Sequence, residues 1–183
     1  MESSGIGSVE PLAREREEPV AAERLARLFE AHQARLYRLA RRLSQDHEEA
    51  RDLVQEAFLR AARNPGKVPR EEPDGEAWLV RVLVNLCRDR HRRLQVRSAH
   101  TPRPAPWADP SASSVARLVV EAALAELAPR RRAVVVMAEL EGLAAAEIGR
   151  LLGVASVTVR WHLLAGRRQL AQLLGAAPRK EEV

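Results

Sequence analysis

The sequence predicts an all-α protein built from two small helical domains. Apolar residues recur at helical spacing within residues 21–93 and again within 115–174. The stretch between them has no such period and holds four prolines in Thr101–Pro110, which is typical of a flexible linker. A chain of 183 residues is long enough for one domain or two small ones. We therefore expect a disordered acidic tail (1–20), a three- to four-helix bundle (21–93), a Pro-rich linker (94–114), a four-helix domain (115–175) and a tail (176–183).

Composition narrows the function classes before any motif is considered. The net charge is +5 and arginine supplies nearly all the basic residues, which suits a partner that carries phosphates or carboxylates. A genome-wide codon bias towards arginine explains the same excess equally well. Cys87 is the only cysteine, so no disulfide forms within the chain, and its apolar neighbours favour a core position. No apolar run approaches 18 residues and no signal peptide is evident, so we expect a cytoplasmic protein without membrane insertion, metal or cofactor.

The first domain begins with a helix predicted over Ala21–Ser44, after a tail of low apolar content that is expected to be disordered. The positions expected to face the core of this helix are Leu25, Leu28, Phe29, Leu36, Leu39, Ala40 and Leu43.

A second helix is predicted to begin at Asp46, which is a good N-cap, and Glu49 three residues later completes a capping box. Asn64-Pro65-Gly66 ends it. Its apolar face comprises Ala50, Leu53, Val54, Ala57, Phe58 and Ala61. The opposite face carries Asp52, Gln55 and Glu56, a surface suited to a basic partner.

A third helix is predicted from about Asp74 to Arg93, with a short extra turn near 67–70. The alternation of Val80, Val82 and Val84 would suit a strand, but the polar residues step by four, three and four, which favours a helix. That polar edge consists of Arg81, Asn85, Arg88 and Arg92, and it widens with Arg90 and Arg93. Trp78 is expected to anchor the core.

The second domain reads as four helices, at Val115–Leu127, Arg130–Leu140, Ala144–Leu152 and Ser156–Leu174. A short helix, a glycine turn at Gly153 and a longer helix capped by Ser156 form a helix-turn-helix pattern. The alternative is that these helices form an ordinary small helical hairpin, without a role in DNA binding. The exposed arginines of the last helix favour DNA binding, and both domains carry a basic excess, 16 against 12 charges in 21–93 and 10 against 7 in 115–183.

Two blocks of sequence resemble a known family. Asp52-Leu53-Val54-Gln55-Glu56-Ala57-Phe58-Leu59-Arg60, with Ala77-Trp78-Leu79-Val80-Arg81 and Asn85-Leu86-Cys87-Arg88-Asp89-Arg90, resembles region 2 of bacterial RNA polymerase sigma factors. Leu127-Ala128-Pro129-Arg130-Arg131-Arg132 through Gly149-Arg150-Leu151-Leu152-Gly153-Val154 resembles sigma region 4. With both blocks in this order, the chain is similar to the extracytoplasmic-function group of sigma factors.

The resemblance implies partners and roles. Asp52, Gln55 and Glu56 would contact the clamp coiled coil of core RNA polymerase, whose flap is also a partner. The third helix would contact the promoter −10 element through Arg81, Asn85, Arg88, Arg92 and Arg93. The −35 element would be read through Ser156, Val157, Thr158, Arg160, Trp161, Leu164, Arg167 and Arg168. The family also implies an anti-sigma factor, which would bury surface on both domains.

The chain departs from the family pattern in the last helix, where Val157, Trp161, Leu164, Ala165 and Gly166 replace the usual residues. Trp161 and Leu164 are expected to be exposed, either to contact thymine methyl groups or to bind a protein. The promoter sequence that this helix reads therefore stays open.

A sigma factor, which acts by binding and strand opening and has no catalytic residue, is the preferred function. Two alternatives remain. A stand-alone helix-turn-helix regulator would not need the face formed by Asp52, Gln55 and Glu56. A DNA recombinase ranks last, because no serine nucleophile motif, metal cluster or acidic triad stands out in the sequence.

Overall fold

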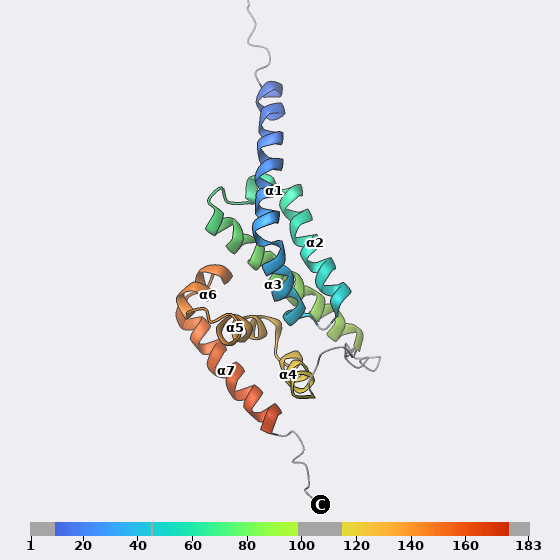
Figure 1. Ribbon diagram of the computed structural model, residues 1–183, viewed down its shortest axis with the longest axis vertical. Coiled ribbons are helices and arrows are strands. Elements are labelled where there is room, and N and C mark those ends of the chain that lie inside the picture. The colour runs from blue at the N-terminus through green and yellow to red at the C-terminus, as the bar shows by residue number, and fades with distance from the viewer. Residues whose placement is uncertain (1–9, 45, 99–114, 176–183) are drawn as a thin grey trace, which may run out of the picture.

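The computed structural model describes residues 10–44, 46–98 and 115–175 (Figure 1). Within these ranges the chain forms seven α-helices, one 3-10 turn and no strand, which confirms the all-α prediction. The first domain contains α1 (Glu10–Leu43), α2 (His47–Arg63), η1 (Pro65–Lys67) and α3 (Glu72–Ser98). The second contains α4 (Val115–Ala125), α5 (Pro129–Glu139), α6 (Ala145–Leu152) and α7 (Ser156–Gly175).

Helices α1, α2 and α3 pack pairwise against one another and enclose the core of the first domain. All six apolar residues predicted for α2 are buried. Leu36, Leu79 and Leu83 are almost inaccessible to solvent, and each contributes about 1.5–3 kcal/mol by its burial. Trp78 is partly buried against the same core, so its predicted anchoring role holds. Phe29 was expected in the core but is 44% exposed. Its ring packs edge-on against the buried Phe58, so it covers the core rather than lying in it.

Asp46 caps α2 as predicted. Its carboxylate oxygens accept hydrogen bonds from the backbone N–H groups of Glu48 and Glu49, both at 3.3 Å. Glu49 was expected to complete a capping box, but its carboxylate lies 2.6 Å from Arg90 Nε on α3. The residue therefore joins two helices of the bundle.

Two predicted boundaries are wrong by several residues. Helix α1 starts at Glu10, so residues 10–20 belong to a helix and not to a disordered tail. Residues 12–18 are mostly good helix formers, and Pro11 falls in the first turn, where it costs little. Helix α3 continues to Ser98, which shortens the expected linker by five residues. The remaining linker, 99–114, lies outside the described residues, as do the termini 1–9 and 176–183.

The second domain has the predicted helix-turn-helix. Helix α6 ends at Gly153, which adopts the left-handed conformation with φ 66° that glycine alone takes without strain. Ile148, Leu151 and Val159 are buried where α6 meets α7. Helix α7 starts at Ser156, so the cap position falls on Ala155, whose carbonyl accepts from Thr158 and Val159. Ser156 was predicted to be the N-cap, but it is the first residue of the helix.

Gly166, one of the departures of α7 from the family pattern, is explained by packing. It is buried, and a Cβ atom at this position would lie 2.5 Å from Val135 Cγ2 on α5. Ordinary side-chain contacts do not approach so closely. The glycine therefore lets α5 and α7 come together.

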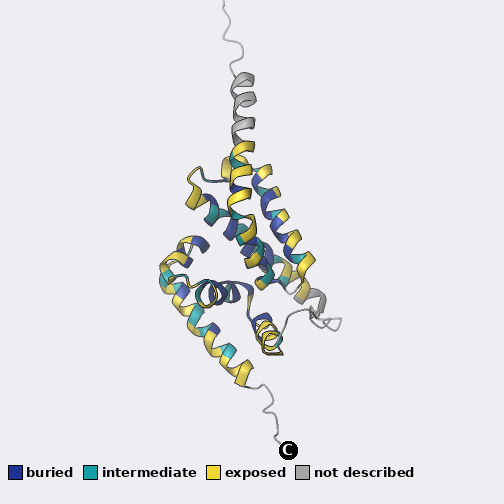
Figure 2. Ribbon diagram, viewed as in Figure 1, coloured by how far each residue is buried: buried dark blue, intermediate teal, exposed yellow. Residues whose placement is uncertain are grey.

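The two domains pack on each other. Helix α3 contacts α5 and α6, and α1 contacts α5. Buried residues of both domains belong to one continuous apolar cluster, which Figure 2 shows as dark blue segments that face one another across the two domains. The chain is therefore more compact than two separate bodies on a linker would be.

Candidate polymerase and DNA interfaces

The outer face of α2 presents the residues that were predicted to contact polymerase. Asp52 and Gln55 are exposed and Glu56 is half-exposed, on the side of the helix opposite the buried Leu53 and Ala57. Glu56 accepts a hydrogen bond from Arg60 at 3.0 Å, four residues along the same helix. Asp52 and Glu56 are like charges four residues apart on the helix, and Arg60 partly balances the repulsion between them.

A groove runs beside this face, between α1 and α2, and has a volume of about 730 Å³. Leu25, Phe29 and Phe58 form part of its apolar lining, and Gln55 and Leu59 lie on its α2 side. Leu59 and Phe29 are 39% and 44% exposed. The groove was not predicted from the sequence, because Phe29 was expected to lie in the core. Leu59, an apolar residue next to the acidic face, is the feature of the sequence that could have indicated it.

The basic edge of α3 divides into two parts. Arg88, Arg92 and Arg93 are exposed near the C-terminal end of the described helix, and Asn85 is half-buried one turn earlier. Arg81 is held against the second domain, with Nη1 3.3 Å from the carbonyl oxygen of Arg150. The structure therefore brings four of the five predicted −10 residues onto one accessible edge and places Arg81 in a domain contact.

The core beneath this edge is apolar. Burial raises the pKa of the Cys87 thiol to about 12, so the thiol stays protonated and unreactive at neutral pH. Burial also raises the pKa of the Glu49 carboxyl, and the Arg90 guanidinium beside it opposes that shift. Cys87 is thus part of the core, whereas Glu49 joins α2 to α3 at its edge.

Helix α7 presents its predicted residues outward. Val157, Arg160, Trp161, Leu164, Arg167 and Arg168 are exposed, whereas Ser156 and Thr158 are half-buried in the first turn. Arg167 forms an ion pair with Glu139 of α5, at 2.7 Å from Nη2. Arg160 is thus the exposed arginine nearest the start of the helix, where readers of the major groove contact bases.

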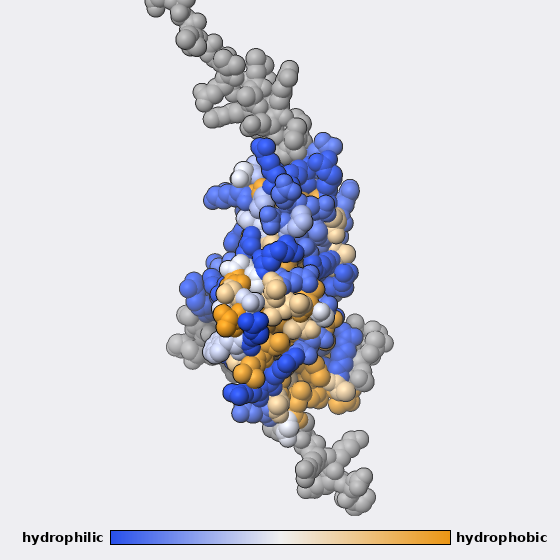
Figure 3. All heavy atoms as spheres, turned by 90° about the vertical axis from the view of Figure 1, so that its left-hand side faces the viewer, coloured by the Kyte–Doolittle hydropathy of each residue, from blue (hydrophilic) through white to orange (hydrophobic). Residues whose placement is uncertain are grey.

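An apolar stripe lies along the same face. Val157, Trp161 and Leu164 are 63%, 59% and 51% exposed and follow one another at helical spacing. Figure 3 shows apolar surface gathered over the lower half of that view, where the second domain lies, below a largely hydrophilic upper half. The Arg131 guanidinium lies 5.9 Å from the centre of the Trp161 ring, so the indole is oriented by a cation–π contact.

His162 lies next to Trp161 and is held neutral. Its pKa is lowered by burial, and the charges of Arg130 and Arg131 lower it further. A neutral imidazole edge against the Trp161 ring, with the ring centroids 4.9 Å apart, completes the local packing. The outward face of α7 therefore carries positive charge only from its arginines.

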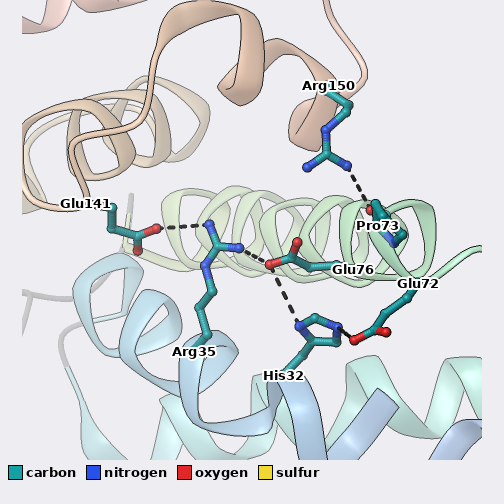
Figure 4. A network of polar contacts seen from close by, with 7 residues as sticks. All are labelled: His32, Arg35, Glu72, Pro73, Glu76, Glu141 and Arg150. Carbon is teal, nitrogen blue, oxygen red and sulfur yellow. Dashed lines mark hydrogen bonds and ion pairs between the residues drawn. The ribbon is translucent and has the colours of Figure 1, made fainter. Parts of the chain in front are cut away.

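Sequence analysis also missed a polar network between the domains (Figure 4). Arg35 of α1 contacts Glu76 of α3 and lies 3.3 Å from Glu141 of the second domain. Arg150 of α6 donates to the carbonyl oxygen of Pro73, at 2.9 Å. These pairs join residues 77 and 106 positions apart, a separation that leaves no local signal in the sequence.

Among the described residues, none of the helices is long and apolar enough to cross a lipid bilayer. The same part of the chain holds no group of three or more His, Cys, Asp or Glu that could bind a metal ion.

The fold and these surfaces define a two-domain protein of the sigma-70 class. Residues 28–97 match the family model for Sigma-70 region 2, and residues 117–170 match the model for Sigma-70, region 4. These spans coincide with the two helical domains described above.

Curated relatives narrow the family. The chain is 39% identical over 162 residues to the ECF RNA polymerase sigma factor SigM of Mycobacterium tuberculosis, covering 85% of this chain and 81% of SigM. It is 40% identical over 157 residues to the ECF sigma factor SigE of Mycolicibacterium smegmatis, covering 80% of this chain and 60% of SigE. The chain belongs to the extracytoplasmic-function family of RNA polymerase sigma factors, which are not enzymes.

Solved structures share the fold. The sigma factor RpoE of Bartonella quintana, crystallised with the anti-sigma factor NepR, superposes with a TM-score of 0.61 at 21% identity, covering 82% of this chain and 96% of RpoE. CnrH, solved in complex with the cytosolic domain of CnrY, superposes with a TM-score of 0.55 at 23% identity, covering 88% of this chain and 98% of CnrH.

Proposed function

We propose that the α2 face formed by Asp52, Gln55 and Glu56 binds the clamp coiled coil of core RNA polymerase. The observation that carries this proposal is the accessible acidic face itself, which is set on a helix whose opposite side is fully buried. A basic partner helix would find carboxylates on the face and apolar surface in the adjoining groove. The chain would act in the cytoplasm, by binding alone and without catalysis.

The two DNA contacts are divided between the domains. Asn85, Arg88, Arg92 and Arg93 would engage the −10 element and its opened strand, because they form an exposed basic edge. Helix α7 would enter the major groove of the −35 element, with Arg160 near the base edges and Arg168 near phosphates. The solved relatives RpoE and CnrH were each crystallised or solved with a protein partner, which supports an anti-sigma factor as a further partner of this chain.

A double substitution separates polymerase binding from folding. Asp52→Ala/Glu56→Ala removes exposed groups, so the free energy of unfolding should change by no more than about 0.5 kcal/mol. Affinity for core polymerase, measured by gel shift, should fall at least about tenfold if these carboxylates lie at the centre of the contact. Glu71→Ala/Glu147→Ala removes the same charge from exposed positions elsewhere and serves as the matched control.

The reciprocal variant is Asn85→Ala/Arg88→Ala/Arg92→Ala. It should bind core polymerase like the wild type and fail to open the −10 region in permanganate footprinting. A folded Asp52→Ala/Glu56→Ala protein that still binds polymerase with wild-type affinity would show that this face is not the docking site.

A further inference from the structure

The apolar stripe of α7, formed by Val157, Trp161 and Leu164, lies on the outward face of the helix. We propose that Trp161 is a specificity-determining residue that reads thymine methyl groups in the −35 element, and that Arg131 of α5 is the positioning residue that orders its indole. This inference rests on the proposed function, which assigns the −35 contact to α7, and it names the base chemistry that the helix selects.

Helix α7 has two opposite faces. The residues of one face are all exposed and recur at i, i+4, i+7 and i+11: Val157, Trp161, Leu164 and Arg168. The residues of the other face repeat this spacing two residues later, about 200° further round the helix, and pack against the core: Val159, Leu163, Gly166 and Leu170. Because the second face is anchored in the domain, the first one points outward.

The surroundings of the stripe favour DNA over a protein partner. Helix α7 contains three arginines, Arg160, Arg167 and Arg168, all of them exposed, and no acidic residue. A duplex supplies phosphates for such charges. In its major groove it also presents the C5-methyl group of thymine, which apolar side chains contact. A charged duplex with methyl groups on its base edges therefore matches both the arginines and the stripe.

Arg131 holds the indole from the side of α5, which packs against α7 (Figure 1). Its guanidinium lies 5.9 Å from the centre of the Trp161 ring, within the range of a cation–π contact. Arg131 Nη1 also donates to Gln169 Oε1 at 2.7 Å, and Gln169 Nε2 donates to the carbonyl oxygen of Glu126 at 3.2 Å. Arg131 is half-buried and engaged in this way, so it acts through the indole and not on a base.

The path of the Arg131 side chain depends on Gly166. A Cβ atom at position 166 would lie 3.2 Å from Arg131 Cγ and 3.6 Å from its Cδ, so the arginine stem passes directly over the glycine. Gly166 and Trp161 both depart from the family pattern, and Arg131 contacts both of them. The His162 ring packs edge-on against the indole as well. The two departures therefore belong to one arrangement, which restricts the rotamers of Trp161.

An indole that is ordered before binding makes the methyl contact count fully towards affinity. Immobilising a large side chain on binding weakens affinity by about two- to tenfold, and the contacts of Arg131 remove that loss. Each methyl group that the stripe buries should then strengthen binding about fourfold. Without the guanidinium, the gain from a methyl group is offset by the entropy of ordering the indole.

Replacing thymine by deoxyuridine tests this reading, because it removes one methyl group and leaves the hydrogen-bonding groups of the base in place. Holoenzyme, assembled from core polymerase and the full-length chain, selects duplexes from a pool with a randomised −35 element. The selected duplexes are then made again with deoxyuridine at single positions. The variants are Trp161→Ala and Arg131→Met, of which the second removes the guanidinium but keeps an unbranched stem over Gly166. The matched control, Arg130→Met, makes the same change one residue earlier on α5.

Wild-type holoenzyme should bind about fourfold more weakly when deoxyuridine replaces thymine at one or more positions. Trp161→Ala should bind both duplexes alike at those positions. Arg131→Met should bind the thymine duplex about two- to tenfold more weakly than the wild type and lose most of the preference, whereas Arg130→Met keeps it. A wild type that never distinguishes the two bases, or a Trp161→Ala protein with the full preference, would overturn the thymine reading. An Arg131→Met protein with the full preference would overturn the positioning role.

Fluorine NMR of the full-length chain, labelled with fluorinated tryptophan, tests the Arg131 contact without DNA. The resonance of residue 161 is the one that Trp161→Ala removes. Arg131→Met should shift and narrow this resonance, because the indole becomes mobile, and Arg130→Met should leave it in place. An unchanged resonance in Arg131→Met would overturn the positioning role.

The selection step separates this inference from the proposed function. If wild-type holoenzyme enriches no −35 sequence, the assignment of α7 to that element is refuted and the thymine reading falls with it. If it enriches a sequence but is indifferent to every thymine methyl group, only the inference is overturned, and the stripe is then left for a protein partner.

Discussion

Replacing Gly166 by alanine sets two effects of opposite sign against each other. In a helix interior alanine is favoured over glycine by about 0.5–1 kcal/mol, so a position without tertiary contacts would be stabilised. In this structure the new Cβ would lie 2.5 Å from Val135 Cγ2 and 3.2 Å from Arg131 Cγ. Val135 is 3% exposed and has little room to move, so overpacking should cost about 1–3 kcal/mol.

The overpacking term wins, and Gly166→Ala should destabilise the protein by about 0.5–2 kcal/mol. The melting temperature should fall by about 1–8 °C, since each kcal/mol shifts it by about 2–4 °C at this chain length. Urea unfolding followed by circular dichroism measures the change. A gain of about 0.5–1 kcal/mol would show that α7 does not rest on α5 at this point.

A double-mutant cycle isolates the cause. Val135→Ala removes the Cγ2 atom that the new methyl group would meet, and it costs stability by itself because it empties buried space. In that background Gly166→Ala should become neutral or stabilising, with a coupling energy of about 1–3 kcal/mol. Additive effects of the two substitutions would contradict the close contact.

Two further outcomes follow from the described surfaces and ionisable groups. Arg160→Ala should weaken binding to the preferred −35 sequence by about 1–3 kcal/mol and reduce discrimination against other sequences, whereas Arg168→Ala should weaken binding to all sequences alike. Fluorescence anisotropy on preferred and scrambled duplexes measures both effects. An equal loss of affinity for the two duplexes on Arg160→Ala would exclude base reading by Arg160. Burial lowers the pKa of His32 below its usual 6.5. As the pH falls, His32 therefore takes up a proton more readily in the unfolded chain than in the folded one, and the free energy of unfolding decreases below about pH 6.5. Urea unfolding from about pH 7.5 to about pH 5.5 should show this loss, and His32→Gln should reduce it; an unchanged slope would exclude His32 as its source.

The sequence predicted the helices well because each one buries a regular apolar face. The α2 prediction succeeded at its cap and at all six buried positions, since a capping aspartate and a 3.6-residue period are local signals. Gly153 was predictable for the same reason, because a left-handed turn between two helices requires glycine. The start of α1 was missed because a polar, acidic segment was taken as disordered, although its residues are good helix formers.

Contacts between distant residues could not be predicted. Arg81 has the same spacing along α3 as Asn85 and Arg88, so its pattern gave no warning that the second domain holds it. Gly166 departs from the family pattern, and nothing in the sequence indicates that Val135 lies beside it. The exposed positions of α7 were anticipated from its periodicity, but the roles assigned to them there, and to the faces of α2 and α3, stay predictions.

Transcription in vitro tests the central claim most directly. Core RNA polymerase is combined with this chain and a library of genomic promoter fragments, and the transcript starts are sequenced. The account predicts a defined set of new starts that core polymerase alone does not produce and that Asp52→Ala/Glu56→Ala abolishes. A start profile identical to that of core polymerase alone, from a folded chain that still binds DNA, would contradict it and favour a stand-alone regulator.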